Sequence, residues 1–273
     1  MDIYERVCCF YENAKTEKRI IGKSLLGREL FAVKMGEGKP VGVATYAMHG
    51  REFITARVAI AHYEREITGS LWLVPLVNPD GALLSQRGIA SVPNGEYRSF
   101  LENYSSQELR LWKANVRGVD LNVNFDADWG EGVKNVRSAG AENYIGETPF
   151  SEPETLALKN FTEELHPDYT LSYHTKGEEI YWYYFQSLHT CPRDKRLAEE
   201  ISRSTGYPLK RAKGSVGGYK DWCIKRLKIP AFTIEAGSDR FSHPIGEEGL
   251  ENILRKNGDT PRVLSKAVAK LYL

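Results

Sequence analysis

The chain has 273 residues, of which 41% are hydrophobic and 27% charged, a balance that is typical of a soluble globular protein with a substantial core. Its 37 basic and 36 acidic residues nearly cancel, which argues against a protein that binds nucleic acid or an anionic membrane through one dominant charge. The start, Met1–Arg6, lacks the pattern of a secretory signal, and no apolar run is long enough to span a membrane. We therefore expect a cytoplasmic protein with reduced thiols at Cys8, Cys9, Cys191 and Cys223.

Strand-like and helix-like segments alternate along the chain, and no long linker divides it, so we expect a single domain over residues 1–273. In the first part of the chain we expect a hairpin of Ile20–Ile21 and Leu30–Met35 around Leu26-Gly27-Arg28, a strand at Val41–Met48, a helix at Glu52–Thr68, a strand at Leu71–Val77 and a turn at Asn78–Gly81. Next come a helix that is capped by Ser151 and ends near Leu165, a strand at Tyr169–Tyr173 and a strand at Tyr181–Phe185 with one face in the core. The last expected elements are a helix at Asp194–Thr205, a strand at Ile229–Ile234 and a helix at Asn252–Leu271. This order predicts an α/β fold with a mixed, mostly parallel twisted sheet and helices on both faces. The segments Ile89–Asn115 and Ala127–Phe150 show weak periodicity and are expected to be lids or rims.

Three strand ends carry side chains that suit a catalytic metal site. His49 and Glu52 follow the strand that begins at Val41, His174 follows the strand at Tyr169–Tyr173, and Glu235 follows the strand at Ile229–Ile234. Ligands of open α/β sheets collect outside the carboxyl ends of the strands, so these residues can converge on one crevice. Catalytic zinc uses three protein ligands and leaves one position open, which predicts one zinc ion held by His49, Glu52 and His174.

With these residues in place, the chain resembles the zinc carboxypeptidases of the carboxypeptidase A type, the funnelin family. The resemblance runs from about Ile21 to Leu271 and rests on four landmarks in the family order: Met48–Glu52, Arg117–Asn122, Ser172–His174 and Phe232–Glu235. It implies a carboxypeptidase-like fold and a metallopeptidase activity. Within the family, His174–Trp182 and Gly217–Trp222 are similar to the subgroup that cleaves γ-D-glutamyl bonds to diamino acids in bacterial cell-wall peptides.

The resemblance also implies roles for individual residues. Glu235 is expected to act as general base and then general acid on a zinc-activated water, and Asp120 to accept a hydrogen bond from the distal nitrogen of His49. Lys113 occupies the position where typical members carry an arginine that stabilises the oxyanion, and it retains the charge without the planar fork. Arg117 and Arg51 are the other candidate cations for this role, and a solvated lysine at the rim describes Lys113 equally well.

Substrate binding is where the sequence departs most from the family. Val123 stands where typical members carry an arginine that clamps the terminal carboxylate, which leaves Asn122 as the retained contact. Lys220 falls in the specificity pocket, although a solvated lysine fits that position equally well, and Lys213 replaces a tyrosine that covers the substrate, for which Tyr219 is a candidate substitute. Together with Arg51, these residues predict a small acidic peptide or muropeptide as substrate, with no nucleic acid, membrane or obligate protein partner.

The sequence is compatible with four functions. The first is hydrolysis of γ-D-glutamyl-diaminopimelate or -lysine bonds in peptidoglycan fragments, which a cytoplasmic enzyme would meet as recycled pieces. The second is an ordinary metallocarboxypeptidase with a modified terminal-carboxylate anchor. The third is an N-acyl amino acid deacylase of the succinylglutamate desuccinylase or aspartoacylase kind, which shares the pattern of His, Glu and a later His. The fourth is an inactive, zinc-containing module that binds muropeptides.

Overall fold

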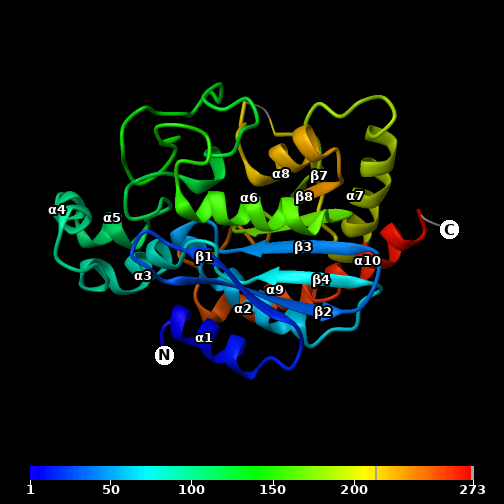
Figure 1. Ribbon diagram of the computed structural model, residues 1–273, viewed down its shortest axis with the longest axis horizontal. Helices are drawn as coiled ribbons and strands as arrows, with labels where there is room; N and C mark the ends of the chain where they lie inside the picture. The colour runs from blue at the N-terminus through cyan, green and yellow to red at the C-terminus, as the bar shows by residue number, and fades with distance from the viewer. Residues whose placement is uncertain (213, 272–273) are drawn as a thin grey trace.

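One eight-stranded sheet forms the centre of the computed structural model, which describes residues 1–212 and 214–271 (Figure 1). The strands are β1 (Lys18–Lys23), β2 (Glu29–Gly36), β3 (Val41–Tyr46), β4 (Ser70–Val74), β5 (Tyr169–His174), β6 (Glu179–Tyr181), β7 (Leu209–Lys210) and β8 (Ala231–Glu235). Their order across the sheet is β1-β2-β4-β3-β5-β8-β6-β7. Strand β3 pairs in parallel with β4 and β5, β5 with β8, and β6 with β7, whereas the β1–β2, β2–β4 and β6–β8 pairings are antiparallel. The expected mixed, mostly parallel sheet is confirmed.

Helices cover both faces of this sheet. They are α1 (Ile3–Asn13), α2 (Ile54–Tyr63), α3 (Pro79–Arg87), α4 (Glu96–Leu101), α5 (Ser106–Arg110), α6 (Pro153–Leu165), α7 (Cys191–Thr205), α8 (Tyr219–Trp222), α9 (Glu247–Asn257) and α10 (Thr260–Ala269). Helix α6 runs along one side of the sheet, and α1 and α2 lie on the other (Figure 1). Among the described residues, no helix combines the length and the apolar character needed to cross a bilayer.

The central strands are apolar on both sides because each side packs against helices. In β4, Leu71 and Leu73 join the cluster that contains side chains of α2, α7, α9 and α10, whereas Trp72 and Val74 join the cluster that contains those of α6 and α8. All five residues of β4 are buried. A strand that is covered on both faces reads as a continuous apolar run, which is why this pattern predicted a buried strand correctly.

Several expected boundaries are wrong. Helix α1 was not foreseen, although Asp2 and Glu5 form a capping box at its start. The expected helix at Glu52–Thr68 is a short 3-10 turn, Gly50–Glu52, followed by α2, which ends at Tyr63. The turn at Asn78–Gly81 is the start of α3, because the Asn78 side chain accepts a hydrogen bond from the backbone N–H of Gly81.

Two later helices also differ from the prediction in where they begin. Ser151 does not cap α6, since its hydroxyl donates to Glu152, and the helix begins without a side-chain cap. The single helix expected at Asn252–Leu271 is two helices, α9 and α10, and Pro261 lies in the first turn of α10. Proline favours a first turn because it has no N–H to place in the helix interior, so a second helix begins there.

The segments expected to be irregular differ from each other. Ile89–Asn115 contains α4 and α5, whereas Ala127–Phe150 contains no helix or strand apart from one isolated bridge between Val136 and Tyr144. The strand expected at Tyr181–Phe185 is also wrong, because β6 covers Glu179–Tyr181 and ends there. Trp182 and Tyr184 are nevertheless buried, while Phe185 is 77% exposed.

Candidate metal centre and active site

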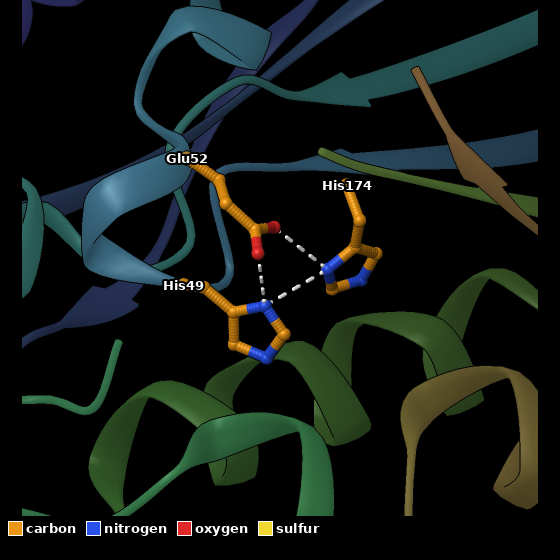
Figure 2. A group of neighbouring side chains, drawn as sticks. All are labelled: His49, Glu52 and His174. Atoms are coloured by element: carbon orange, nitrogen blue, oxygen red, sulfur yellow. Dashed lines mark hydrogen bonds and ion pairs between the residues drawn. The ribbon is translucent and has the colours of Figure 1, made fainter. Parts of the chain in front are cut away.

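His49, Glu52 and His174 meet at one edge of the sheet. His49 lies just beyond the end of β3, Glu52 ends the 3-10 turn that follows it, and His174 is the last residue of β5. Because β3 and β5 are parallel neighbours, their carboxyl ends lie side by side. Figure 2 shows the three buried side chains pointing toward one another.

The donor atoms of these residues suit a divalent metal ion. Nδ1 of His49 lies 2.9 Å from Oε1 of Glu52 and 3.1 Å from Nδ1 of His174, which lies 3.0 Å from Oε2 of Glu52. Two unprotonated ring nitrogens at this separation repel each other unless a proton or a cation lies between them. Two imidazoles and one carboxylate are also the ligand set of many catalytic zinc sites. The residues therefore fit the zinc ion that the sequence predicts.

Asp120 fixes the orientation of the His49 ring. Its Oδ1 lies 3.2 Å from Nε2 of His49, and its Oδ2 lies 3.0 Å from Nζ of Lys113. Asp120 is fully buried, and burial alone would raise its pKa, but Lys113 and His49 hold the pKa well below its usual range. An ionised Asp120 favours the tautomer of His49 that carries its proton on Nε2 and leaves Nδ1 free to bind a metal.

Glu235 lies beside this centre at the end of β8. It pairs in register with His174 of β5, so the two side chains leave the sheet at the same edge. Burial is the largest influence on the pKa of Glu235 and raises it, His174 and Lys113 lower it, and Glu52 raises it, so that the net pKa is about 7. A carboxyl group in such a position is suited to proton transfer near neutral pH.

A pocket of about 610 Å³ opens next to Glu235. The predicted residues that line it are Lys113, Arg51, Asn122, Lys220 and Glu235, and Val123 also contributes to the wall. Other lining residues come from the loops around Val133 and Arg211, where Val133 N–H donates to the carbonyl of Gly214 at 2.9 Å. The two loops thus contact each other at this pocket.

The charged side chains that line the pocket differ in their ion pairs and hydrogen bonds. Lys113 is bound to Asp120, and Arg51 lies 3.5 Å from Glu142. Lys220 is only 6% exposed, donates to Asp221 and to the carbonyl of Tyr183, and is not the solvated lysine of the alternative interpretation. Its place in the wall was predicted, but its pairing with Asp221 was not.

Two of the sequence candidates do not reach the pocket. The guanidinium of Arg117 donates to the hydroxyl of Tyr97 at 3.2 Å and lies 3.4 Å from Glu152, so the structure does not bring it to the metal centre. The side chain of Tyr219 is fully buried and its hydroxyl bonds to Thr162, so it cannot cover a substrate. Only the backbone N–H of Tyr219 approaches the site, where it donates to Oδ1 of Asn122 at 3.2 Å.

Sequence reasoning missed Lys134, Glu142 and Arg211, which all line the pocket. They lie in irregular segments whose path is not encoded by periodicity, and no sequence signal would have found them. Lys213, the residue in the position of the covering tyrosine, lies outside the described residues.

Comparison with known proteins decides the family. Residues 12–255 match the family model described as "Zinc carboxypeptidase". The chain belongs to the zinc carboxypeptidase family. Both the family and the fold expected from the sequence are thereby confirmed.

Bacterial members of this family are similar to the chain over most of its length. A Lysinibacillus sphaericus protein named gamma-D-glutamyl-L-diamino acid endopeptidase 1 is 33% identical over 83% of this chain and 62% of its own length. The chain thus spans less than two thirds of that relative. Murein peptide amidase A of Escherichia coli K12 is 29% identical over 78% of each chain.

Solved structures share the fold of this chain. The structure of bovine thrombin-activatable fibrinolysis inhibitor matches it with a TM-score of 0.80 at 20% identity, and the match covers 99% of this chain and 98% of the bovine one.

Proposed function

We propose that this family member hydrolyses the amide bond between D-glutamate and diaminopimelate or lysine in small acidic peptides derived from peptidoglycan. The observation that carries the proposal is the lining of the 610 Å³ pocket. It contains Val123 where an arginine that binds the terminal carboxylate was expected, and its cationic side chains lie at other positions of the lining. The names of the Lysinibacillus and Escherichia relatives support the same class of substrate.

His49, Glu52 and His174 would hold the zinc ion, which when bound would supply Lewis acidity and lower the pKa of a water molecule to near neutral. Glu235 lines the pocket beside these ligands and takes the proton of the attacking water. The same carboxyl group then passes that proton to the leaving amine, which departs as the free diamino acid. This cycle needs a carboxyl group that both accepts and donates near neutral pH.

Lys113 is the cation that we assign to the developing oxyanion. It lines the pocket while its ammonium remains 3.0 Å from Asp120, so its position is held by an ion pair. A preorganised charge of this kind stabilises a transition state without reorganisation during the reaction. Arg117, in contrast, is engaged with Glu152 and Tyr97 and has no part in the proposal.

The pocket suits a substrate that carries carboxylates in unusual places. An ordinary peptide terminus would lack a bidentate partner at Val123. A γ-D-glutamyl peptide presents the α-carboxylate of D-glutamate near the scissile bond and at least one carboxylate on the diamino acid. Arg51 and Lys220 both line the pocket and offer charged donors for such groups, with Asn122 as a neutral one.

The test is hydrolysis of L-alanyl-γ-D-glutamyl-meso-diaminopimelate beside a blocked dipeptide, with metal content measured and products identified by mass spectrometry. Release of diaminopimelate by a protein with one zinc ion per chain is the expected result. Cleavage of the blocked dipeptide alone would instead indicate an ordinary carboxypeptidase with a rebuilt anchor.

Two other outcomes would also overturn the proposal. Full affinity for the tripeptide without turnover would indicate a binding module. Cleavage of N-acyl amino acids alone would indicate a deacylase, a reading that the match to the zinc carboxypeptidase family disfavours.

A further inference from the structure

We infer that Arg211 selects a diamino acid whose distal carbon bears a carboxylate, so that the enzyme prefers diaminopimelate to lysine. The inference rests on the proposed function, since it concerns the residue released from the γ-D-glutamyl bond. It assigns a specificity-determining role to a side chain that no family landmark includes.

Arg211 lines the pocket and is held there by aromatic rings rather than by an acidic partner. Its guanidinium carbon lies 4.3 Å from the ring centroid of Tyr183 and 5.5 Å from that of Trp182. No carboxylate among the described residues forms an ion pair with it. A guanidinium that stacks on a ring keeps its N–H edge free, and that edge matches a carboxylate in a bidentate way.

The sheet sets the distance between Arg211 and the reacting bond. Arg211 directly follows β7, and β6 separates β7 from β8, on which Thr233 and Glu235 lie. Neighbouring strands are about 4.8 Å apart, so β7 runs roughly 10 Å from β8. The backbone of Arg211 is thus set apart from the strand that carries Glu235, and we place the distal end of the diamino acid, rather than the scissile amide, beside Arg211.

Tyr183 connects Arg211 with a buried ion pair. The ring of Tyr183 stacks on Arg211, and its carbonyl accepts a hydrogen bond from Lys220, which also donates to Asp221. Lys220 and Asp221 both line the pocket. This end of the pocket thus presents two cations and one anion.

The distal end of diaminopimelate matches these charges and the end of lysine does not. Diaminopimelate carries a carboxylate and an ammonium on its distal carbon, so the carboxylate can bind Arg211 while the ammonium approaches Asp221. Lysine brings an ammonium alone into a region of net positive charge. Opposite charges on substrate and pocket add specificity, whereas like charges that face each other are unfavourable.

The test compares kcat/KM for three peptides that differ only in the last residue: L-alanyl-γ-D-glutamyl-meso-diaminopimelate, its L-lysine analogue and its L-norleucine analogue. We expect Arg211→Gln to lower the ratio of kcat/KM for the diaminopimelate peptide to that for the lysine peptide about tenfold, since a charge-assisted bidentate contact is lost at an exposed site. Arg211→Glu should shift the ratio further toward lysine. The norleucine peptide, which lacks both distal charges, reports whether a variant has lost general competence.

Arg240→Gln is the matched control. Arg240 is also exposed and stacked, with its guanidinium carbon 4.9 Å from the Phe241 ring centroid, but it does not line the pocket, and the ratio should stay that of the wild type. An unchanged ratio in Arg211→Gln, or a wild-type preference for lysine, would overturn the inference.

Calorimetry separates this inference from the proposed function. If the wild-type zinc protein cleaves none of the three peptides, the proposed activity is wrong. The binding affinities for the diaminopimelate and lysine peptides, measured by calorimetry, still test the preference for diaminopimelate. Tighter binding of the diaminopimelate peptide that is lost in Arg211→Gln would support the role of Arg211 in binding. Equal affinities for the diaminopimelate and lysine peptides would refute it.

Discussion

Replacing Asp120 by asparagine tests how the metal centre is held in place. Four nitrogen atoms lie around its carboxylate: Nε2 of His49 at 3.2 Å and Nζ of Lys113 at 3.0 Å, together with the backbone N–H groups of Asn122 and Asn143, which donate to it at 3.1 Å each. An asparagine side chain has the same shape but only one acceptor oxygen, and its amide is itself a donor. At least one of the nitrogen donors that then faces the amide group, instead of an oxygen, loses its acceptor.

The expected cost follows from the burial of these groups. An unsatisfied buried donor costs about 1–3 kcal/mol, and more when it is charged. The Lys113 side chain is 19% exposed, so water replaces part of what it loses. We therefore expect Asp120→Asn to lower the free energy of unfolding of the metal-free protein by about 2–4 kcal/mol. Zinc affinity should fall about 10–100-fold, because the His49 ring is no longer fixed in the tautomer that binds metal.

Urea unfolding of the metal-free protein and competition with a chelator measure these two quantities separately. Asp126→Asn is the control, since the Asp126 side chain is 46% exposed and its ion pair with Arg226 lies at the surface. That control should change the free energy of unfolding by less than about 1 kcal/mol and leave zinc affinity unaltered. If Asp120→Asn bound zinc as tightly as the wild type, the argument that Asp120 orients His49 would be wrong.

Three further predictions concern catalysis. Glu235→Gln should retain one zinc ion per chain and lose turnover by about 100-fold or more, whereas His174→Ala should lose the metal. Metal analysis and kcat, measured on both variants, distinguish the two effects. Normal turnover in Glu235→Gln would exclude Glu235 as the general base. Lys113→Gln should lower kcat about 100-fold while Arg117→Gln stays within about twofold, and the reverse order in steady-state kinetics would reassign the oxyanion cation. Val123→Arg should raise kcat/KM for a blocked dipeptide about tenfold, because it adds a bidentate donor for a terminal carboxylate; no gain would mean that the missing clamp does not explain the preference.

Local sequence patterns predicted the parts of the fold that depend on neighbouring residues. The apolar runs of β3, β4, β5 and β8 were recognised because strands covered on both faces leave no polar alternation. Helix ends were predicted less well. Asn78 was assigned to a turn although it caps α3, and the break between α9 and α10 was overlooked, because the apolar stripe continues across both helices.

The candidate metal ligands could be predicted because topology leaves little choice about where they go. His49, Glu52 and His174 follow strands that run in the same direction side by side, and such strands end at one edge of the sheet. The position of Glu235 follows in the same way from its pairing with His174. Periodicity places each of these residues near a strand end, and the parallel pairing of β3, β5 and β8 in the structure brings the four together.

The substrate pocket needed the tertiary structure. Arg117 and Tyr219 were assigned to the site by their place in the sequence, yet one is engaged with Glu152 and the other is buried in the core. Arg211 carried no signal, because its role depends on loops whose path is set by packing and by contacts such as that between Val133 and Gly214. Local hydrophobic patterns encode the buried strands and the side chains at their carboxyl ends, so these could be predicted from the amino-acid sequence. The order of the strands and the charges that line the pocket depend on contacts between residues that are distant in the chain, and they became known from the fold.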